Sequence, residues 1–296
     1  MTFHFQKAEL TDRAVRRVCL DHVGEALKRL RQSRHPAAVH GVRKEIKKLR
    51  AILRLVRGQI GPGAYRRTAR RLRQVADRLA APRDARVTLQ AFEKLAGPKA
   101  ARQFRKIHQA LRKNCRQETR RFRGDNSVRV AKQILRKICR RVADLKIKSA
   151  GWLAIEPGLR QSYRRGRLAY QLARRQRSAE NFHRWRKHVK DLWHHLRLLC
   201  PAWPEPARAM LHDLEQLGEL LGNDHDLVLL RQFVAERCKE QASAVAGLNQ
   251  LIEARQKKLR AAALKLGAKL YAEKPVKVGA QLGKLWIAWR GTPDTH

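Results

Sequence analysis

The chain has 296 residues, with 68 Lys and Arg against 25 Asp and Glu, so its net charge at pH 7 is +43. Self-repulsion on this scale predicts an acidic partner: nucleic acid, an anionic membrane surface or a phosphate polymer. Hydrophobic residues make up 43% of the chain, which excludes a disordered basic tail, and no apolar run approaches the roughly 18 residues that a membrane span needs.

The cysteines and the N-terminus indicate a cytoplasmic protein. The segment from Met1 to Leu30 is charged throughout and lacks the apolar stretch of a signal peptide. The five cysteines are scattered, odd in number and never spaced as C-x-x-C, which argues against disulfides and structural zinc. We expect each to be a small buried apolar side chain. They are Cys19, Cys115, Cys139, Cys200 and Cys238.

Helix-forming residues dominate the whole chain, and the elements are separated by Gly and Pro. Between the breaks lie segments of roughly 15–25 residues with apolar side chains spaced by three and four, which predicts about nine or ten helices. Short connections predict antiparallel neighbours, as in helical bundles. In chain order the predicted breaks are 58–63, 82, 97–98, 124–126, 157–158, 201–206, 222–223 and 275.

The sequence also repeats itself. The segment VHGVRKEIKKLRAILRLV (39–56) aligns without gaps on FHRWRKHVKDLWHHLRLL (182–199), at an offset of 143, with eight of eighteen positions identical. Each copy is followed by a second matched piece, 72–89 and 214–231, with Asp84 opposite Asp226. The repeat predicts two related helical halves, 1–148 and 149–296, which together form one domain.

On a helix, one side of each repeated segment is apolar and predicts a bundle core. The apolar side chains are Val39, Val42, Ile46, Leu49, Leu53 and Val56 in the first copy, and Phe182, Trp185, Val189, Leu192, Leu196 and Leu199 in the second.

The opposite side of each segment is a column of cationic side chains with no acid among them. Like charges four residues apart repel, so a solvated helix face usually mixes signs. A bound polyanion would remove this repulsion and add charge-assisted hydrogen bonds. We therefore expect a paired polyanion-binding surface rather than a merely solvated basic face. Its residues are His40, Arg43, Lys44, Lys47, Arg50 and Arg54, and His183, Arg186, Lys187, Lys190, His194 and Arg197.

Further candidates lie outside the repeated segments. Arg160, Tyr163, Arg164 and Arg167 share one helical face, where guanidinium groups and a hydroxyl suit phosphate oxygens. The pairs Arg83-Asp84 and His225-Asp226 are predicted to open the matched downstream helices. An Asp there more often caps a helix than catalyses, although it could also orient its basic neighbour.

These motifs resemble the conserved-histidine α-helical domain, CHAD. The resemblance rests on the two repeated segments, on GLRQSYRRGR, PRDA, LGNDHDL and LGAKLYAEKP, and on their order from about residue 4 to 274. It implies an all-α fold of two pseudo-symmetric four-helix bundles with a central basic cavity or groove that binds inorganic polyphosphate. It also implies a binding module without catalytic residues, metal or cofactor, found alone at polyphosphate granules or fused to a triphosphatase domain.

The resemblance assigns binding residues position by position. His40, Arg43, Lys47, Lys48 and Arg50 match the first basic motif of the family, and His183, Arg186 and Lys190 match the second. The chain then departs from the pattern, because Asp191 and Trp193 stand where the family often has basic residues and His194 where it often has Tyr. No E-x-E-x-K motif of a fused triphosphatase is present near the start.

Three other interpretations fit parts of the sequence. Nonspecific nucleic-acid binding fits the charge, but aromatic residues are only 6% of the chain and no RRM, KH, zinc-finger or helix-turn-helix pattern is visible. A metal-dependent phosphohydrolase built on His225 and Asp226 would need acids on neighbouring faces, where few occur. Binding to a membrane surface would need apolar faces that are already used by the predicted core. The favoured prediction is therefore non-catalytic capture of linear polyphosphate, with nonspecific nucleic-acid binding as the alternative.

Overall fold

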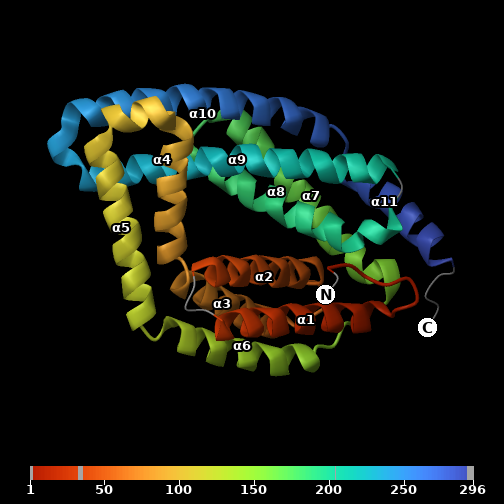
Figure 1. Ribbon diagram of the computed structural model, residues 1–296. Helices are drawn as coiled ribbons and strands as arrows, with labels where there is room; N and C mark the ends of the chain where they lie inside the picture. Colours follow the sequence, from red (N-terminus) through yellow and green to blue (C-terminus); the bar gives the residue numbers. More distant parts are fainter. Residues whose placement is uncertain (1–2, 33–35, 204, 292–296) are drawn as a thin grey trace.

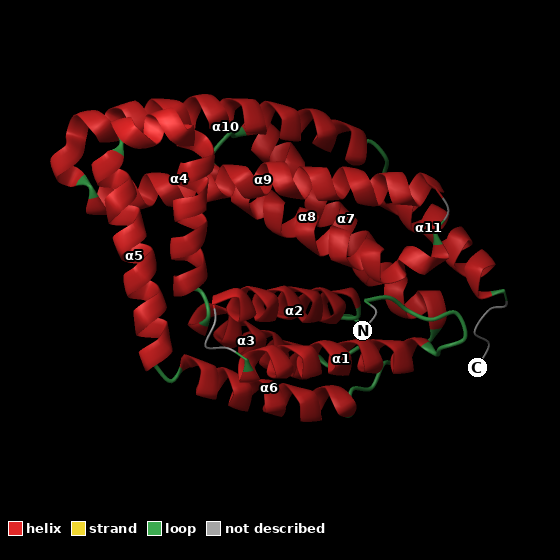
Figure 2. Ribbon diagram, in the orientation of Figure 1, coloured by secondary structure: helices red, strands yellow, loops and turns green. Residues whose placement is uncertain are grey.

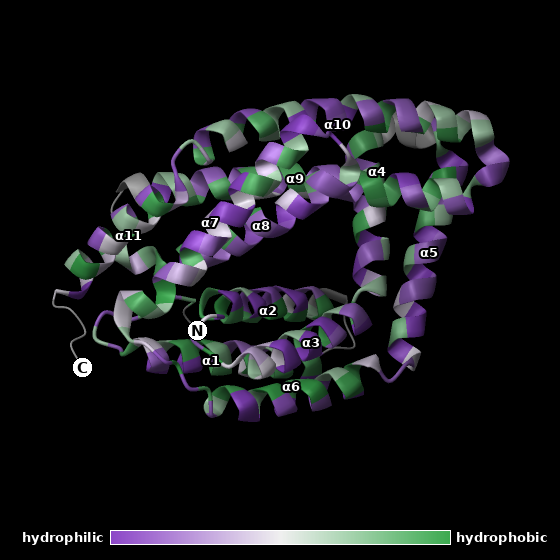
Figure 3. Cartoon of the chain, turned by 180° about the vertical axis from the view of Figure 1, so that it is seen from behind, coloured by the Kyte–Doolittle hydropathy of each residue, from purple (hydrophilic) through white to green (hydrophobic). Residues whose placement is uncertain are grey.

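The computed structural model describes residues 3–32, 36–203 and 205–291 (Figure 1). Within these ranges the chain forms eleven α-helices, two short 3-10 helices and no strand, which confirms the all-α prediction (Figure 2). Hydrophilic and hydrophobic residues alternate along most helices, as expected when one side of a helix is buried and the other is solvated (Figure 3).

Four helices of the first half form a bundle, in which α1 packs on α2 and α6, and α3 packs on α2 and α6 (Figure 1). All six predicted apolar side chains of α2, from Val39 to Val56, are buried, which confirms the predicted core face. The members of the bundle are α1 (Thr11–Arg31), α2 (Pro36–Leu55), α3 (Pro62–Arg78) and α6 (Ser127–Ala143).

The second half is built mainly of long helices. Helix α8 packs between α7 and α9, α10 lies along α9, and α11 packs on α7. The six predicted apolar side chains of α8, from Phe182 to Leu199, are again buried. The helices are α7 (Gly151–Arg175), α8 (Ala179–Leu199), α9 (Glu205–Arg237), α10 (Ala242–Leu270) and α11 (Pro275–Arg290), with 3-10 turns at Cys200–Ala202 and Lys239–Gln241.

Helix α4 (Ala81–Gln103) leaves the first bundle and reaches α9 and α10, and α5 (Arg105–Gly124) packs on α4 and returns to α6 (Figure 1). Phe92, Phe104 and Leu111 form a second apolar core with residues of the other half, such as Leu230 and Ile252. This core lies across the predicted boundary at 148/149. The division into two halves therefore stays a prediction from the sequence repeat, and residues of both halves contribute to this core.

The repeat is visible in the helix positions. Helices α2 and α8 begin at residues 36 and 179, and α3 and α9 begin at 62 and 205, so both pairs are offset by 143 residues. The first half breaks between α3 and α4, whereas α9 continues through the corresponding region. The predicted break at Gly222-Asn223 is therefore wrong, because a glycine inside a helix costs only about 1 kcal/mol, an amount that packing can offset.

Two other predicted breaks have different outcomes. Pro157-Gly158 does not end a helix, since α7 continues through it. Gly158 lies so close to the backbone oxygen of Leu55 that a β-carbon would not fit, so this glycine serves the contact between α7 and α2. Gly97, in contrast, has a φ of 63° and kinks α4 at the predicted position.

All five cysteines are free thiols. Only Cys19 and Cys238 are buried, so the expectation of burial is wrong for Cys115, Cys139 and Cys200, which are partly exposed. Cys19 is fully buried, and burial raises its pKa to about 12. Over the described ranges, no helix is long and apolar enough to cross a membrane.

Candidate functional site

Helices α2, α4, α8 and α9 meet where the first bundle faces the second (Figure 1), and basic side chains of all four lie near one another there. Their proximity is evident from their electrostatic effects on one another, which connect residues as distant in sequence as Arg83 and His225. We call this group the basic cluster. It consists of Arg43 and Lys47 of α2, Arg83 of α4, His183, Arg186 and Lys190 of α8, and His225 of α9.

Lys47 lies at the centre of the basic cluster. Surrounding protein atoms reduce its solvation, and the charges of Arg186, Arg83, Arg43 and Lys190 oppose a further positive charge. Together these effects lower the pKa of Lys47 to about 7. Lys47 is exposed and forms no direct ion pair among the described residues, so an anionic ligand can approach it and offset the surrounding positive charge.

Two carboxylates offset part of this charge. Asp84 accepts a hydrogen bond from Arg83 at 2.8 Å, so it orients its neighbour as the sequence suggested. Asp226 lies close enough to Arg186, Arg83 and Lys47 to feel their charges, yet burial raises its pKa overall. Contrary to expectation, Asp226 and His225 lie within α9 and do not begin a helix.

Two histidines of the basic cluster stack on each other. The ring centroids of His183 and His225 are 4.1 Å apart, with an interplanar angle of 28°. Burial and the neighbouring cations lower the pKa of His183 to about 4 and that of His225 to about 3. Both rings are therefore neutral at pH 7 in the free protein, and a bound polyanion would favour their protonation.

Two glycines of α9 lie beside the long cations of α8. A β-carbon on Gly218 would stand 2.8 Å from Nζ of Lys190, so this glycine gives Lys190 room to lie against α9. A β-carbon on Gly222 would stand at an ordinary contact distance of 3.7 Å from Nε of Arg186. The i,i+4 spacing of the two glycines places both on the helical face that α8 contacts.

His40, Lys44 and Lys187 are exposed residues at the rim of the basic cluster. Partial loss of solvation is the main cause that lowers the pKa of His40, and the charges of Lys44 and Lys47 lower it further. Lys187 lowers the pKa of His183 in the same way. The structure therefore brings these three predicted residues to the same region.

Other predicted residues of α2 and α8 lie at the opposite end of the helix pair, and their cations have acid partners. Arg54 donates to Oδ1 of Asp191 at 2.7 Å, and Arg50 lies near both. Arg54 and Asp191 border a recess of about 600 Å³ that is also lined by Arg165 and His188. We call it the far recess.

Lys48 lies away from the basic cluster. It pairs with Glu45 at 3.1 Å and lies over the ring of Phe3, while Glu45 also contacts Nδ1 of His22 at 2.6 Å. This buried carboxylate holds Lys48 in place, so the structure gives it a partner within the fold rather than a place in the basic cluster.

His194 and Arg197 lie beyond the basic cluster, toward the end of α8. His194 is buried beside Phe3 and Trp193, so the expectation that it presents its ring on the cationic surface is corrected. Arg197 is exposed over Trp193, at 5.1 Å from the ring centroid, and Lys190 lies over the same ring at 5.3 Å.

The predicted basic face of α7 is partly occupied by protein contacts. The Tyr163 hydroxyl is buried and lies 3.0 Å from the Leu270 carbonyl oxygen and 3.1 Å from that of Glu273, which corrects its expected role as a phosphate donor. Arg167 donates to the Tyr271 carbonyl, and Arg160 pairs with Glu156. Arg164 alone of the four is exposed without a partner among the described residues.

Comparison with known protein families identifies the family of this chain. The sequence profile of the CHAD domain matches residues 14–235, which is more than half of the chain. The chain belongs to the CHAD family. No curated protein matches it.

Solved structures support the fold assignment of this CHAD protein. PptA from Streptomyces chartreusis matches with a TM-score of 0.64 and 14% identity, covering 90% of this chain and all of PptA. The CHAD domain from the plant Ricinus communis matches with a TM-score of 0.59 and 17% identity, covering 94% of this chain and 93% of that one. At these identities the likeness concerns the fold.

The structure explains one departure from the CHAD pattern. Asp191, at a position that is often basic in the family, is the partner of Arg54 and is nearly enclosed by the packing of α2 on α8. Within the described ranges, no group of three or more His, Cys, Asp or Glu side chains could hold a metal ion.

Proposed function

We propose that this CHAD protein is a non-catalytic binding module for inorganic polyphosphate, and that the linear chain lies on the basic cluster. The observation that carries the proposal is the convergence of basic side chains from four helices around Lys47, which is itself exposed and within electrostatic reach of Arg43, Arg83, Arg186 and Lys190. Such a group gains more from an anion than an isolated surface lysine does, because the ligand relieves repulsion that the fold itself creates.

The arginines and lysines have complementary parts in this proposal. Arg186 offers a planar fork that can donate two hydrogen bonds to one phosphate. Arg43 and Arg83 each use one guanidinium nitrogen within the fold, on the Ala76 carbonyl and the Asp84 carboxylate, and would bind phosphate through the others. Lys47 and Lys190 act as compact charges. Repeated phosphates along a flexible chain can meet several of these groups at once, with release of counterions. A lining of cations also suits an anionic polymer better than a metal ion, which supports a binding role rather than hydrolysis. The cytoplasm, and polyphosphate granules within it, are the proposed locations.

Charge reversal tests the proposal. The double variants Arg43→Glu/Lys47→Glu and Arg186→Glu/Lys190→Glu should each lose most of their affinity for long-chain polyphosphate at about 150 mM salt. The slope of log affinity against log salt should become shallower by about one unit for each phosphate that the variant no longer neutralises.

A matched control makes the same change in net charge at two residues outside the basic cluster. The variant Arg112→Glu/Arg116→Glu alters two exposed arginines of α5 without partners among the described residues. It should bind polyphosphate almost as the wild type does, and circular dichroism should show unchanged helix content in all three variants. Equal losses of affinity in the control and the cluster variants would contradict the proposed site.

The alternative function, nonspecific nucleic-acid binding, is supported by a different surface. Arg112, Arg116, Arg120 and Arg123 are exposed along α5, at spacings that place them on one side of the helix. Such a stripe can meet phosphates of any sequence. Separate binding isotherms of duplex DNA and of polyphosphate at about 150 mM salt distinguish the candidates, because a nucleic-acid-binding protein should bind DNA at least as tightly as polyphosphate.

A further inference from the structure

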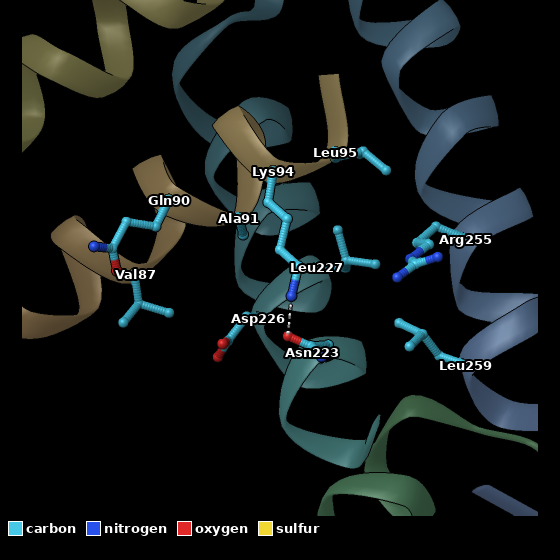
Figure 4. A pocket seen from close by; sticks show the side chains of 10 residues that line it. All are labelled: Val87, Gln90, Ala91, Lys94, Leu95, Asn223, Asp226, Leu227, Arg255 and Leu259. Carbon is cyan, nitrogen blue, oxygen red and sulfur yellow. Dashed lines mark hydrogen bonds between the residues drawn. The ribbon is translucent and has the colours of Figure 1, made fainter. Parts of the chain in front are cut away.

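A small pocket lies between α4, α9 and α10, with apolar walls and a few polar groups (Figure 4). Its volume is about 210 Å³. Lys94 points to Asn223, with Nζ 3.4 Å from Oδ1, and Arg255 lies on the opposite side from Val87 and Gln90 (Figure 4). The lining residues are Val87, Gln90, Ala91, Lys94, Leu95, Asn223, Asp226, Leu227, Arg255 and Leu259. We call this the α4–α9 pocket.

The α4–α9 pocket continues from the basic cluster along two helices. On α4, Arg83 of the cluster is followed by Val87 and Ala91 of the pocket, each one turn further on the same face. On α9, Gly218 and Gly222 face Lys190 and Arg186, and Asp226 follows at the next turn. One helical turn advances about 5.4 Å, so pocket and cluster are adjacent parts of one surface.

Asp226 belongs to both parts. It lines the pocket, and the charges of Arg186, Arg83 and Lys47 act on its carboxylate. Its Oδ1 is inaccessible to solvent and has no hydrogen-bond partner within the described chain. A buried acceptor without a donor is costly, so a ligand that brings an N–H group to this position would satisfy it.

The chemistry of the pocket does not match a phosphate chain. Five apolar side chains form its walls, and a polyphosphate chain has no apolar part to place against them. A flat ring with apolar faces and N–H groups at its edge fits both the walls and the free oxygen of Asp226. A nucleobase has this character, and in a nucleotide it is joined to phosphates.

We propose that the α4–α9 pocket takes the base of a purine nucleoside triphosphate whose phosphates lie on the basic cluster. The inference rests on the proposed function, since the cluster is the phosphate site in both. The base lies against the apolar wall that includes Ala91 and Leu227, and its N–H groups donate to Asp226. Arg186 and Arg83, at the adjacent turns, bind the phosphates.

The test compares ATP and GTP with inorganic tripolyphosphate by calorimetry, without divalent metal. Tripolyphosphate carries more negative charge than either nucleotide, so electrostatics alone would make it bind more tightly. A buried base should reverse this order, and we expect ATP or GTP to bind roughly tenfold more tightly than tripolyphosphate. Nucleotides that bind no better than tripolyphosphate overturn the inference and leave the proposed function standing. If none of the three ligands nor long-chain polyphosphate binds, the proposed function fails as well.

Two variants locate the base. Ala91→Phe fills the pocket and should abolish the preference for nucleotides while tripolyphosphate binds as before, whereas Ala261→Phe, at an exposed position of α10, should retain it. Asp226→Asn removes an anion beside the basic cluster, so it should strengthen tripolyphosphate binding and weaken the nucleotide preference. A preference that survives in both Ala91→Phe and Asp226→Asn places the base elsewhere and overturns the inference.

Discussion

The two ends of the α2–α8 pair carry similar cations in different surroundings. In the basic cluster, Lys47 and Arg186 have no ion pair among the described residues. At the far recess, Arg54 is paired with Asp191 at 2.7 Å. One end therefore retains repulsion that Asp84 and Asp226 only partly offset and that a ligand can relieve, whereas the other uses its charge to join the two helices. A basic motif alone does not identify a binding residue, because an acid partner from another helix decides its role.

Glycine substitutions should show the largest contrast between the two ends. A β-carbon on Gly158 would collide with the backbone oxygen of Leu55, which cannot move without shifting α2. We expect Gly158→Ala to lower the free energy of unfolding by about 3 kcal/mol. Gly222→Ala meets only the Arg186 side chain, at ordinary contact distance, and should gain up to about 1 kcal/mol from helix propensity. Urea denaturation measures both, and equal effects would contradict the difference in packing.

Removal of single charges should separate stability from binding. Asp191→Asn leaves Arg54 in a partly buried site without its carboxylate and should cost about 2 kcal/mol of stability. Arg186→Gln removes a cation from a repulsive group, so it should leave stability unchanged or slightly higher while polyphosphate affinity falls roughly tenfold. Denaturation curves measure the stability of the two variants, and binding isotherms measure their affinity for polyphosphate. A lower stability of Arg186→Gln than of Asp191→Asn would contradict the comparison.

Acidification should act on the free protein through its neutral histidines. The pKa values of His183 and His225, about 4 and 3, lie below the value of about 6.5 in the unfolded chain. Between pH 6.5 and 4 the unfolded chain therefore binds more protons, and the free energy of unfolding falls as the pH is lowered. Bound polyphosphate should reduce this fall, because it favours the protonated rings.

The variant His183→Gln/His225→Gln should show a weaker dependence of stability on pH and a smaller effect of polyphosphate on it. His188→Gln is the control from the far recess. Its pKa of about 4 also makes it contribute to acid destabilisation, but it should leave the effect of polyphosphate unchanged. Melting temperatures between pH 4 and 7, with and without polyphosphate, measure both, and an equal effect of the two variants on the polyphosphate response would contradict the assignment.

The smallest effect is expected at Tyr163. Tyr163→Phe loses the hydrogen bonding of its hydroxyl to the Leu270 and Glu273 carbonyls, at and just after the end of α10, and should cost about 1 kcal/mol of stability. Polyphosphate affinity should not change, because the hydroxyl is buried away from the basic cluster. A clear loss of affinity, measured by the same titration as for Arg186→Gln, would restore Tyr163 as a ligand.

The sequence was most informative where the periodicity of apolar residues and the repeat agreed. The buried faces of α2 and α8 follow from spacing alone, because a helix with one apolar side must bury it. The sorting of the cations could not be predicted in this way. Asp191 and Arg54 are 137 residues apart in the sequence, and Tyr163 and Glu273 are 110 residues apart. Only tertiary packing brings such partners together. Gly222 shows the same limit, since its local tendency to end a helix is overridden by packing.

The second apolar core has a consequence for synthesis. Phe92 and Leu111 lie in the first half, whereas Leu230 and Ile252, against which they are buried, emerge from the ribosome more than 100 residues later. At usual elongation rates this interval lasts roughly 10 seconds. During it, α4 and α5 expose an apolar side beside the arginines of α5. The nascent chain is therefore most vulnerable to aggregation and to capture by cellular RNA before α9 and α10 are complete.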